Sequence, residues 1–203
     1  MTTTAELIPT TRNVTRVFRK ASLAEVQAGK DWYAAAHRAA VDFSGRHNVS
    51  VEIAAGVIAA TSPLNSWGSN VRLADKVLAA GGSKTDGYLG LGLRKANLII
   101  AGADPVKTLN GLKTVNFYRS IVTEGREGIT IDRHAWSIAV NFRYEGGVVP
   151  NIGVKRYDAA SESYTRAARI LSAEYGMALS PAVVQAVTWV AWRNRWWSEG
   201  AWD

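Results

Sequence analysis

Three adjacent side chains that can carry charge, Asp132, Arg133 and His134, lie at the start of the apolar segment GITIDRHAWSIAV, residues 128–140. Charged groups are rarely placed beside a core unless they are paired or have a task. A carboxylate in such a place can stabilise a cationic sugar or position a nucleophile, as in glycoside hydrolysis. The structural alternative is that Asp132 caps a helix, because aspartate is a preferred N-cap residue. We take Asp132 as the candidate catalytic carboxylate.

Arg133 and His134 are candidates for contacts with a bound nucleic acid. Arg133 could bind a phosphate or pair with a carboxylate, and a plain surface position is an equally good interpretation. His134 follows Asp132 by two positions, a spacing that puts the two side chains on different faces of a helix. A supporting role is therefore favoured over that of a base, and we place His134 among the residues that would line a base pocket.

A short segment upstream, LNGLKT at residues 109–114, lies between two helical patterns. A helix, a glycine-containing turn and a second helix can direct backbone N–H groups at a phosphate. This predicts phosphate contacts from Asn110, Gly111 and Thr114. Lys113 beside this turn is a candidate amine nucleophile, and a solvated lysine at a helix start is an equally good interpretation.

The C-terminal segment QAVTWVAWRNRWW combines tryptophan with arginine. Trp189, Trp192 and Trp196 share one helical stripe, with Arg193 and Arg195 between and beside them. A core helix is the favoured interpretation of this stripe. The alternative is a surface on which Trp192 stacks against a base while Arg193 and Arg195 hold phosphates.

The loop SPLNSWGSN, residues 62–70, interrupts two helical patterns with proline, glycine and asparagine. Trp67 and Asn65 in this loop are candidates for a wedge in a duplex or for the lining of a base pocket.

No cofactor and no metal site are expected. The chain has no cysteine, which excludes disulfides, thiolate nucleophiles and iron–sulfur clusters. Its three histidines, His37, His47 and His134, are scattered, and no carboxylate-rich loop has the spacing of metal ligands.

The elements that must position these residues are helices. Caps and stops support the apolar periodicity: Ser50, Asp104 with Pro105, and Ser180 with Pro181 begin helical patterns, and Gly176 ends one. No strand pairing and no linker is recognisable, which predicts an all-α protein of one domain. The expected helical segments are 23–45, 50–62, 70–82, 92–102, 104–109, 110–125, 157–176 and 180–196.

The composition of the chain indicates which class of partner it could bind. The 203 residues are 47% hydrophobic and carry a formal net charge of +7. Such a field attracts polyanions, of which nucleic acid is the commonest, although a solvated basic surface is the alternative. No apolar run reaches the ~20 residues of a membrane span, and no signal-peptide pattern is found. We therefore expect a cytoplasmic protein with no membrane contact, and we also expect a monomer.

Taken together in order, these segments resemble the helix-hairpin-helix DNA glycosylase superfamily, the endonuclease III-like group. LNGLKTV (109–115) is similar to that family's hairpin LPGVGxKTA, and TIDRHAW (130–136) to its V-D-T-H stretch. The segments 57–78 and 89–100 resemble two helices that precede the hairpin, so the similarity covers about residues 50–142. The hairpin here is about two residues shorter and lacks the second glycine.

The resemblance implies a fold of two helical lobes with a cleft between them, one lobe at about 50–125 and the other at about 14–49 plus 128–203. It implies double-stranded DNA as the partner and a base-excising N-glycosylase as the activity. Asp132 would stabilise positive charge on the deoxyribose, and Lys113 could displace the base and allow strand cleavage.

Two other functions remain open on this scaffold. Viral relatives of these glycosylases, the glutamyl-putrescinyl-thymine pyrophosphorylase-like enzymes, modify a base on its exocyclic methylene instead of removing it. This is the second function. The third alternative is a DNA-binding module without catalysis.

Overall fold

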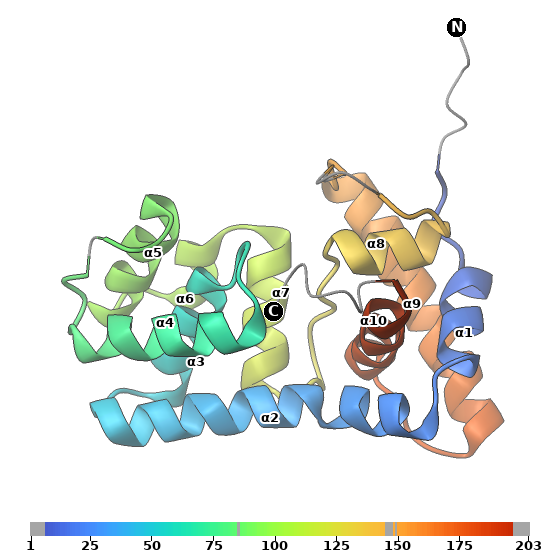
Figure 1. Cartoon of the computed structure of the whole chain (residues 1–203), viewed down its shortest axis with the longest axis horizontal. Coiled ribbons are helices and arrows are strands. Elements are labelled where there is room, and N and C mark those ends of the chain that lie inside the picture. Colours follow the sequence, from blue (N-terminus) through green and yellow to red (C-terminus); the bar gives the residue numbers. More distant parts are fainter. Residues whose placement is uncertain (1–6, 85, 145–147, 149, 197–203) are drawn as a thin grey trace, which may run out of the picture. The chain divides into compact units, whose positions relative to one another are not determined.

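The protein is helical. The computed structural model describes residues 7–84, 86–144, 148 and 150–196, and within these ranges the regular structure consists of helices without a strand (Figure 1). This confirms the all-α prediction. The chain divides into two compact units, called unit 1 (residues up to 31 and 129–196) and unit 2 (32–128).

Unit 1 is discontinuous in sequence. Its helices are α1 (Thr11–Arg19), the first part of α2 (Leu23–His47), α8 (Arg133–Val140), α9 (Val154–Tyr175) and α10 (Pro181–Trp196).

Within the described residues, unit 2 is continuous in sequence. Its helices are the rest of α2, α3 (Val51–Thr61), α4 (Trp67–Ala79), α5 (Gly90–Ile100), α6 (Pro105–Leu109) and α7 (Leu112–Val122).

Local signals begin α3 and α6 where the sequence predicts them. The hydroxyl of Ser50 accepts a hydrogen bond from the Ile53 amide at 3.2 Å, and the carboxylate of Asp104 accepts from the Val106 amide at 2.8 Å. Both side chains satisfy N–H groups that a helix start leaves without partners. Gly176 ends α9 in the left-handed conformation that glycine adopts without strain.

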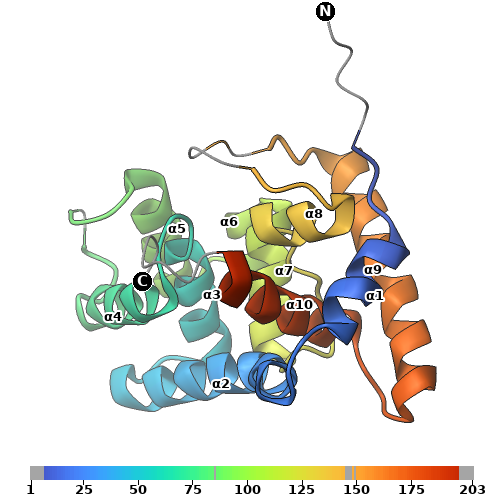
Figure 2. The ribbon, with the colours of Figure 1, turned by 45° about the vertical axis from the view of Figure 1, so that its right-hand side comes forward.

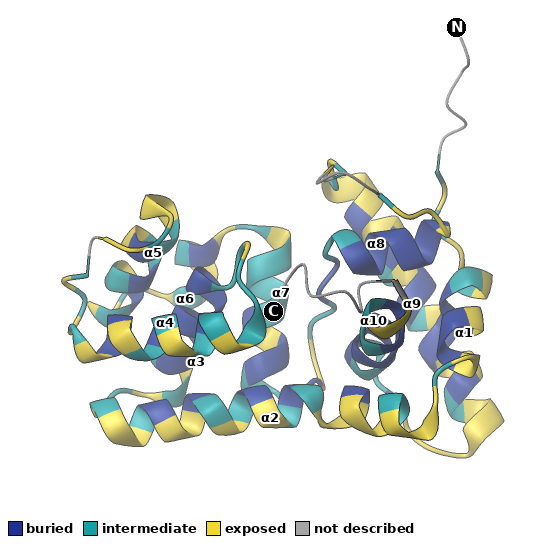
Figure 3. Cartoon of the chain, viewed as in Figure 1, coloured by how far each residue is buried: buried dark blue, intermediate teal, exposed yellow. Residues whose placement is uncertain are grey.

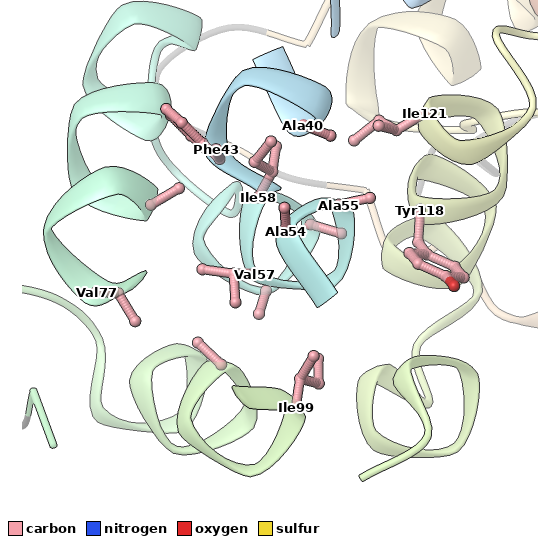
Figure 4. Packing of buried hydrophobic residues seen from close by; sticks show 14 of the residues in the cluster. Ala40, Phe43, Ala54, Ala55, Val57, Ile58, Val77, Ile99, Tyr118 and Ile121 are labelled. Carbon is pink, nitrogen blue, oxygen red and sulfur yellow. The ribbon is translucent and has the colours of Figure 1, made fainter. Parts of the chain in front are cut away.

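The core of unit 2 is built around α3. Residues 54–61 of this helix are all buried, and α4, α5, α6 and α7 pack against it (Figure 4). A helix that is apolar on every side has to be enclosed in this way. Close approach of α5 requires Gly92, because a Cβ there would lie 2.9 Å from the carbonyl oxygen of Ala60.

The core of unit 1 is enclosed by α1, α8, α9 and α10, which pack against one another (Figure 2). Every residue of α8 from His134 to Val140 is buried, whereas α9 has an exposed face (Figure 3). Helix α1 lies outside the helical segments that the sequence predicts, and it buries Val14, Val17 and Phe18.

The boundary between the units lies inside α2, between residues 31 and 32. The resemblance places the whole of 14–49 with the C-terminal half, and residues 32–49 instead belong to unit 2. The glycosylase-like arrangement of two lobes stays a prediction. None of the helices within the described ranges is long and apolar enough to span a membrane.

Candidate functional site

Asp132 lies at the start of α8 with each carboxylate oxygen bound by a different donor. Oδ1 accepts from the backbone N–H of Ala135 at 2.8 Å, and Oδ2 accepts from the indole Nε1–H of Trp189 at 3.0 Å. The first bond is an ordinary N-cap. The second comes from α10, 57 positions along the chain, and it goes beyond what capping requires. The carboxylate is half-buried and is held in one orientation.

The segment that leads into Asp132 is fixed by α9. The hydroxyl of Tyr157 donates to the carbonyl of Ile129 at 2.6 Å and accepts from the amide of Ile131 at 3.2 Å. One buried side chain therefore satisfies two backbone groups that have no helix or sheet to pair with. This fixes the direction in which the chain reaches the start of α8.

A second tyrosine supports the first turn of α8. The hydroxyl of Tyr164 donates to the carbonyl of Ala135 at 3.1 Å. Burial raises the pKa of Tyr164 far above its usual value, so this group stays a neutral donor. Tyr164 therefore holds the first turn of α8 beside Asp132.

The indole of Trp189 is enclosed by groups from two helices. The ring of His134 meets it edge-on with centroids 6.2 Å apart, and the guanidinium of Arg193 lies 4.7 Å from its centroid. A cation over the face of tryptophan is attracted by the ring quadrupole. His134 itself is buried, with 9% of its surface exposed, so it packs beside Asp132 in a supporting position.

The C-terminal stripe divides between core and surface. Trp192 is 7% exposed, so it belongs to the core of unit 1, as the favoured interpretation of the stripe predicts, and its alternative place on an exposed stacking surface is wrong. Arg195 donates to the Lys20 carbonyl and lies 3.9 Å from Glu25, which ties it to the protein and weakens its assignment to DNA. Arg193 is half-buried beside Trp189. The side chain of Trp196 lies outside the described residues.

Arg133 is the first residue of α8 and is half-buried. Its carbonyl accepts from the hydroxyl of Ser137 at 2.7 Å. Its assignment to a DNA phosphate stays a prediction.

The predicted hairpin is present in unit 2. Helix α6 ends at Leu109, Asn110 adopts a left-handed φ of 45°, and α7 starts after Gly111. Gly111 supplies no side-chain cap, and no acidic residue lies in the first turn of α7. The positive end of the α7 helix dipole is therefore not offset by an acidic side chain in the first turn of that helix.

Lys95 of α5 holds the hairpin turn, a role that no sequence pattern indicates. Its Nζ donates to the Leu109 carbonyl at 2.6 Å and to Asn110 Oδ1 at 2.9 Å. The hydroxyl of Thr114 donates to the Gly111 carbonyl at 3.1 Å. These bonds fix the turn from both sides and leave the half-buried Lys113 in the first turn of α7.

The loop between α3 and α4 is braced by side-chain bonds. Asn65 Nδ2 donates to the Thr61 carbonyl at 2.8 Å, so this amide is engaged within the loop. Trp67, predicted to lie in this loop, is instead the first residue of α4; it is half-buried and packs against Trp32 with ring centroids 5.7 Å apart. In the same loop Leu64 has a φ of 63°, which leucine rarely adopts, and is 72% exposed. The tip of the loop is apolar, a feature that no sequence pattern indicated.

Lys113 belongs to unit 2 and Asp132 to unit 1, so each is held by the residues of its own unit. Across the described ranges, histidine and carboxylate side chains do not gather in groups of three or more that could hold a metal ion. Taken separately, unit 1 offers a fixed carboxylate, and unit 2 offers a helix start with a lysine in its first turn.

The described residues define an all-helical protein with a short helical hairpin. At the start of one helix, a carboxylate accepts a hydrogen bond on each of its two oxygens. The chain belongs to DUF7178, a family of unknown function, whose model matches residues 1–196. Comparison with curated proteins and with solved structures finds no match in either group.

Proposed function

We propose that this protein is a DNA base-acting enzyme, in the first place an N-glycosylase that extrudes and excises a modified or damaged base. The observation that carries the proposal is the carboxylate of Asp132, held by Ala135 and Trp189 at the start of α8. It follows the hairpin in the order and at the spacing that the glycosylase resemblance implies.

The reaction suits a fixed carboxylate. When the bond from the base to the sugar C1′ breaks, its electron pair leaves with the base and positive charge develops on the deoxyribose. Asp132 would stabilise that charge until water adds to C1′, in the way carboxylates act in glycoside hydrolysis. A preorganised charge needs no reorientation as the reaction proceeds, which is why such electrostatic terms are large.

The hairpin supports DNA as the partner. Backbone N–H groups at the start of α7, with Lys113 in the first turn, match what a phosphate requires. We assign Asn110, Gly111 and Thr114 to this contact. The formal charge of +7 adds general attraction to the duplex.

A second candidate function is hypermodification of a base that stays attached to its sugar. The two-residue turn of the hairpin, Asn110 and Gly111, is shorter than the glycosylase motif that it resembles. Both candidate functions require an extruded base, and they differ in whether the bond to the sugar survives.

Product analysis separates the candidates. The protein is incubated with duplexes that carry different damaged or modified bases, and the digested nucleosides are analysed by mass spectrometry. Release of free base is the expected result, whereas a mass-shifted nucleoside would establish modification. Salt-dependent binding without either product would leave a DNA-binding module, and absence of binding at low salt would exclude all three functions.

Borohydride reduction tests the amine role of Lys113. If its Nζ displaces the base at C1′, the lysine and the sugar form a Schiff base. Borohydride reduction should then trap the protein on DNA, and Lys113→Ala should abolish trapping. Lys76→Ala in α4 is the control lysine and should be trapped like the wild type. Base release by a wild-type protein that is never trapped would reduce Lys113 to a binding residue and leave the chemistry to Asp132.

A further inference from the structure

The bond between Trp189 and Asp132 is more than a helix cap requires. Capping of α8 uses Asp132 Oδ1, which accepts from the Ala135 amide at 2.8 Å. The indole N–H occupies the other oxygen at 3.0 Å. With one donor on each oxygen, rotation of the carboxylate about its last side-chain bond would break a hydrogen bond. Without Trp189, α8 would hold the Asp132 carboxylate by a single hydrogen bond. The bond from Trp189 therefore fixes the carboxylate in one orientation.

Trp189 is itself held in place. It follows Thr188, whose hydroxyl bonds to the Val184 carbonyl at 2.9 Å inside the buried part of α10. The edge contact with His134 and the guanidinium of Arg193 restrict the ring from two directions. A cation over the ring face also polarises the indole, which strengthens its N–H as a donor.

We infer that Trp189 is a positioning residue for Asp132, an inference that rests on the proposed function. Its N–H fixes one carboxylate oxygen, so that the remaining lone pairs face the sugar in a constant geometry. A displacement of about 1 Å at a reacting group can cost about 100-fold in rate. Side chains that hold a catalytic group by hydrogen bonds are therefore as necessary to turnover as its charge.

Removal of the N–H with the ring retained is the direct test. Trp189→3-benzothienylalanine replaces N–H with sulfur in a side chain of nearly the same shape, and Trp189→Phe is the simpler variant. We expect the single-turnover rate to fall about 10- to 100-fold, with DNA affinity unchanged because no phosphate contact is lost. The matched control is Trp136→3-benzothienylalanine, since that indole donates to the Tyr144 hydroxyl at 3.1 Å in the same unit. The control should keep the wild-type rate.

A double-mutant cycle shows whether Trp189 acts through Asp132. In an Asp132→Asn background, replacement of Trp189 should change the residual rate by less than about twofold, because groups that act as a unit are not additive. Independent, additive losses would overturn the positioning role. If the wild type is active and its Trp189 variants keep the full rate, the positioning role would be overturned while the proposed function would stand. A wild type that neither releases nor modifies a base would overturn the proposed function and this role with it.

Discussion

Asp132→Asn should lower the single-turnover rate of the protein on its DNA substrate by at least about 100-fold, the scale of a lost electrostatic contribution in a preorganised site. The amide is nearly isosteric and its oxygen can still accept from the Ala135 N–H, so α8 should keep its start. Binding to duplex DNA should persist or tighten, because a negative charge leaves the protein. Single-turnover kinetics and a filter-binding titration measure the two quantities.

The same substitution carries a structural cost that the bond to Trp189 predicts. With the oxygen of the introduced amide on Ala135, its NH₂ group would face the indole N–H, and two donors cannot bond to each other. A half-buried donor left unsatisfied costs about 1–3 kcal/mol, so Tm should fall by a few degrees while the protein stays folded.

Asp104→Asn is the matched control for this experiment. Asp104 is also an N-cap aspartate, bonded to the Val106 and Lys107 amides, and in the proposed reaction it has no role. It should keep the wild-type rate. If Asp132 is only a cap, both variants should behave alike, and near-wild-type turnover of Asp132→Asn would remove the catalytic assignment.

Gly29→Ala should destabilise the protein by about 3 kcal/mol or more, at or above the upper end of overpacking costs. Gly29 is buried in α2, and a Cβ there would lie 2.3 Å from the Cα of Val187 in α10. The obstacle is backbone, which cannot rotate away as a side chain can. At about 2–4 °C per kcal/mol for a chain of this size, Tm should fall by roughly 6–12 °C in a thermal melt.

Gly45→Ala in the same helix is the opposite case. Gly45 is exposed, and a Cβ there would meet nothing within 4 Å. Alanine should stabilise α2 by about 0.5–1 kcal/mol, because glycine loses more backbone freedom on folding. Equal melting temperatures for the two variants would contradict the close contact between α2 and α10.

Local chemistry made much of the fold predictable. Ser50, Asp104 and Asp132 each lie where a side-chain oxygen could satisfy helical N–H groups, and all three serve as N-caps. The hairpin turn was predictable for the same reason, since an Asn–Gly pair between helical patterns favours a turn. Helix α1 was missed because its nine residues are mostly polar, and its apolar face is stabilised only by packing against α8, α9 and α10.

The fine geometry of the candidate site was not predictable. The spacing in α10 shows that Trp189 and Trp192 lie near one another on a helix, but not which of them is buried. The bond from Trp189 to Asp132 joins residues 57 apart, and Lys95 reaches Asn110 across 15. Such contacts depend on tertiary packing and leave no periodic signal in the sequence.

The discontinuity of unit 1 sets an order for folding during synthesis. The described part of unit 2 is complete once residue 128 has emerged from the ribosome, whereas α1 gains its partners α8, α9 and α10 only from the last third of the chain. Domains generally fold as they emerge. The apolar face of α1, with Val14, Val17 and Phe18, therefore stays uncovered while unit 2 is translated, which exposes it to non-native contacts in the nascent chain.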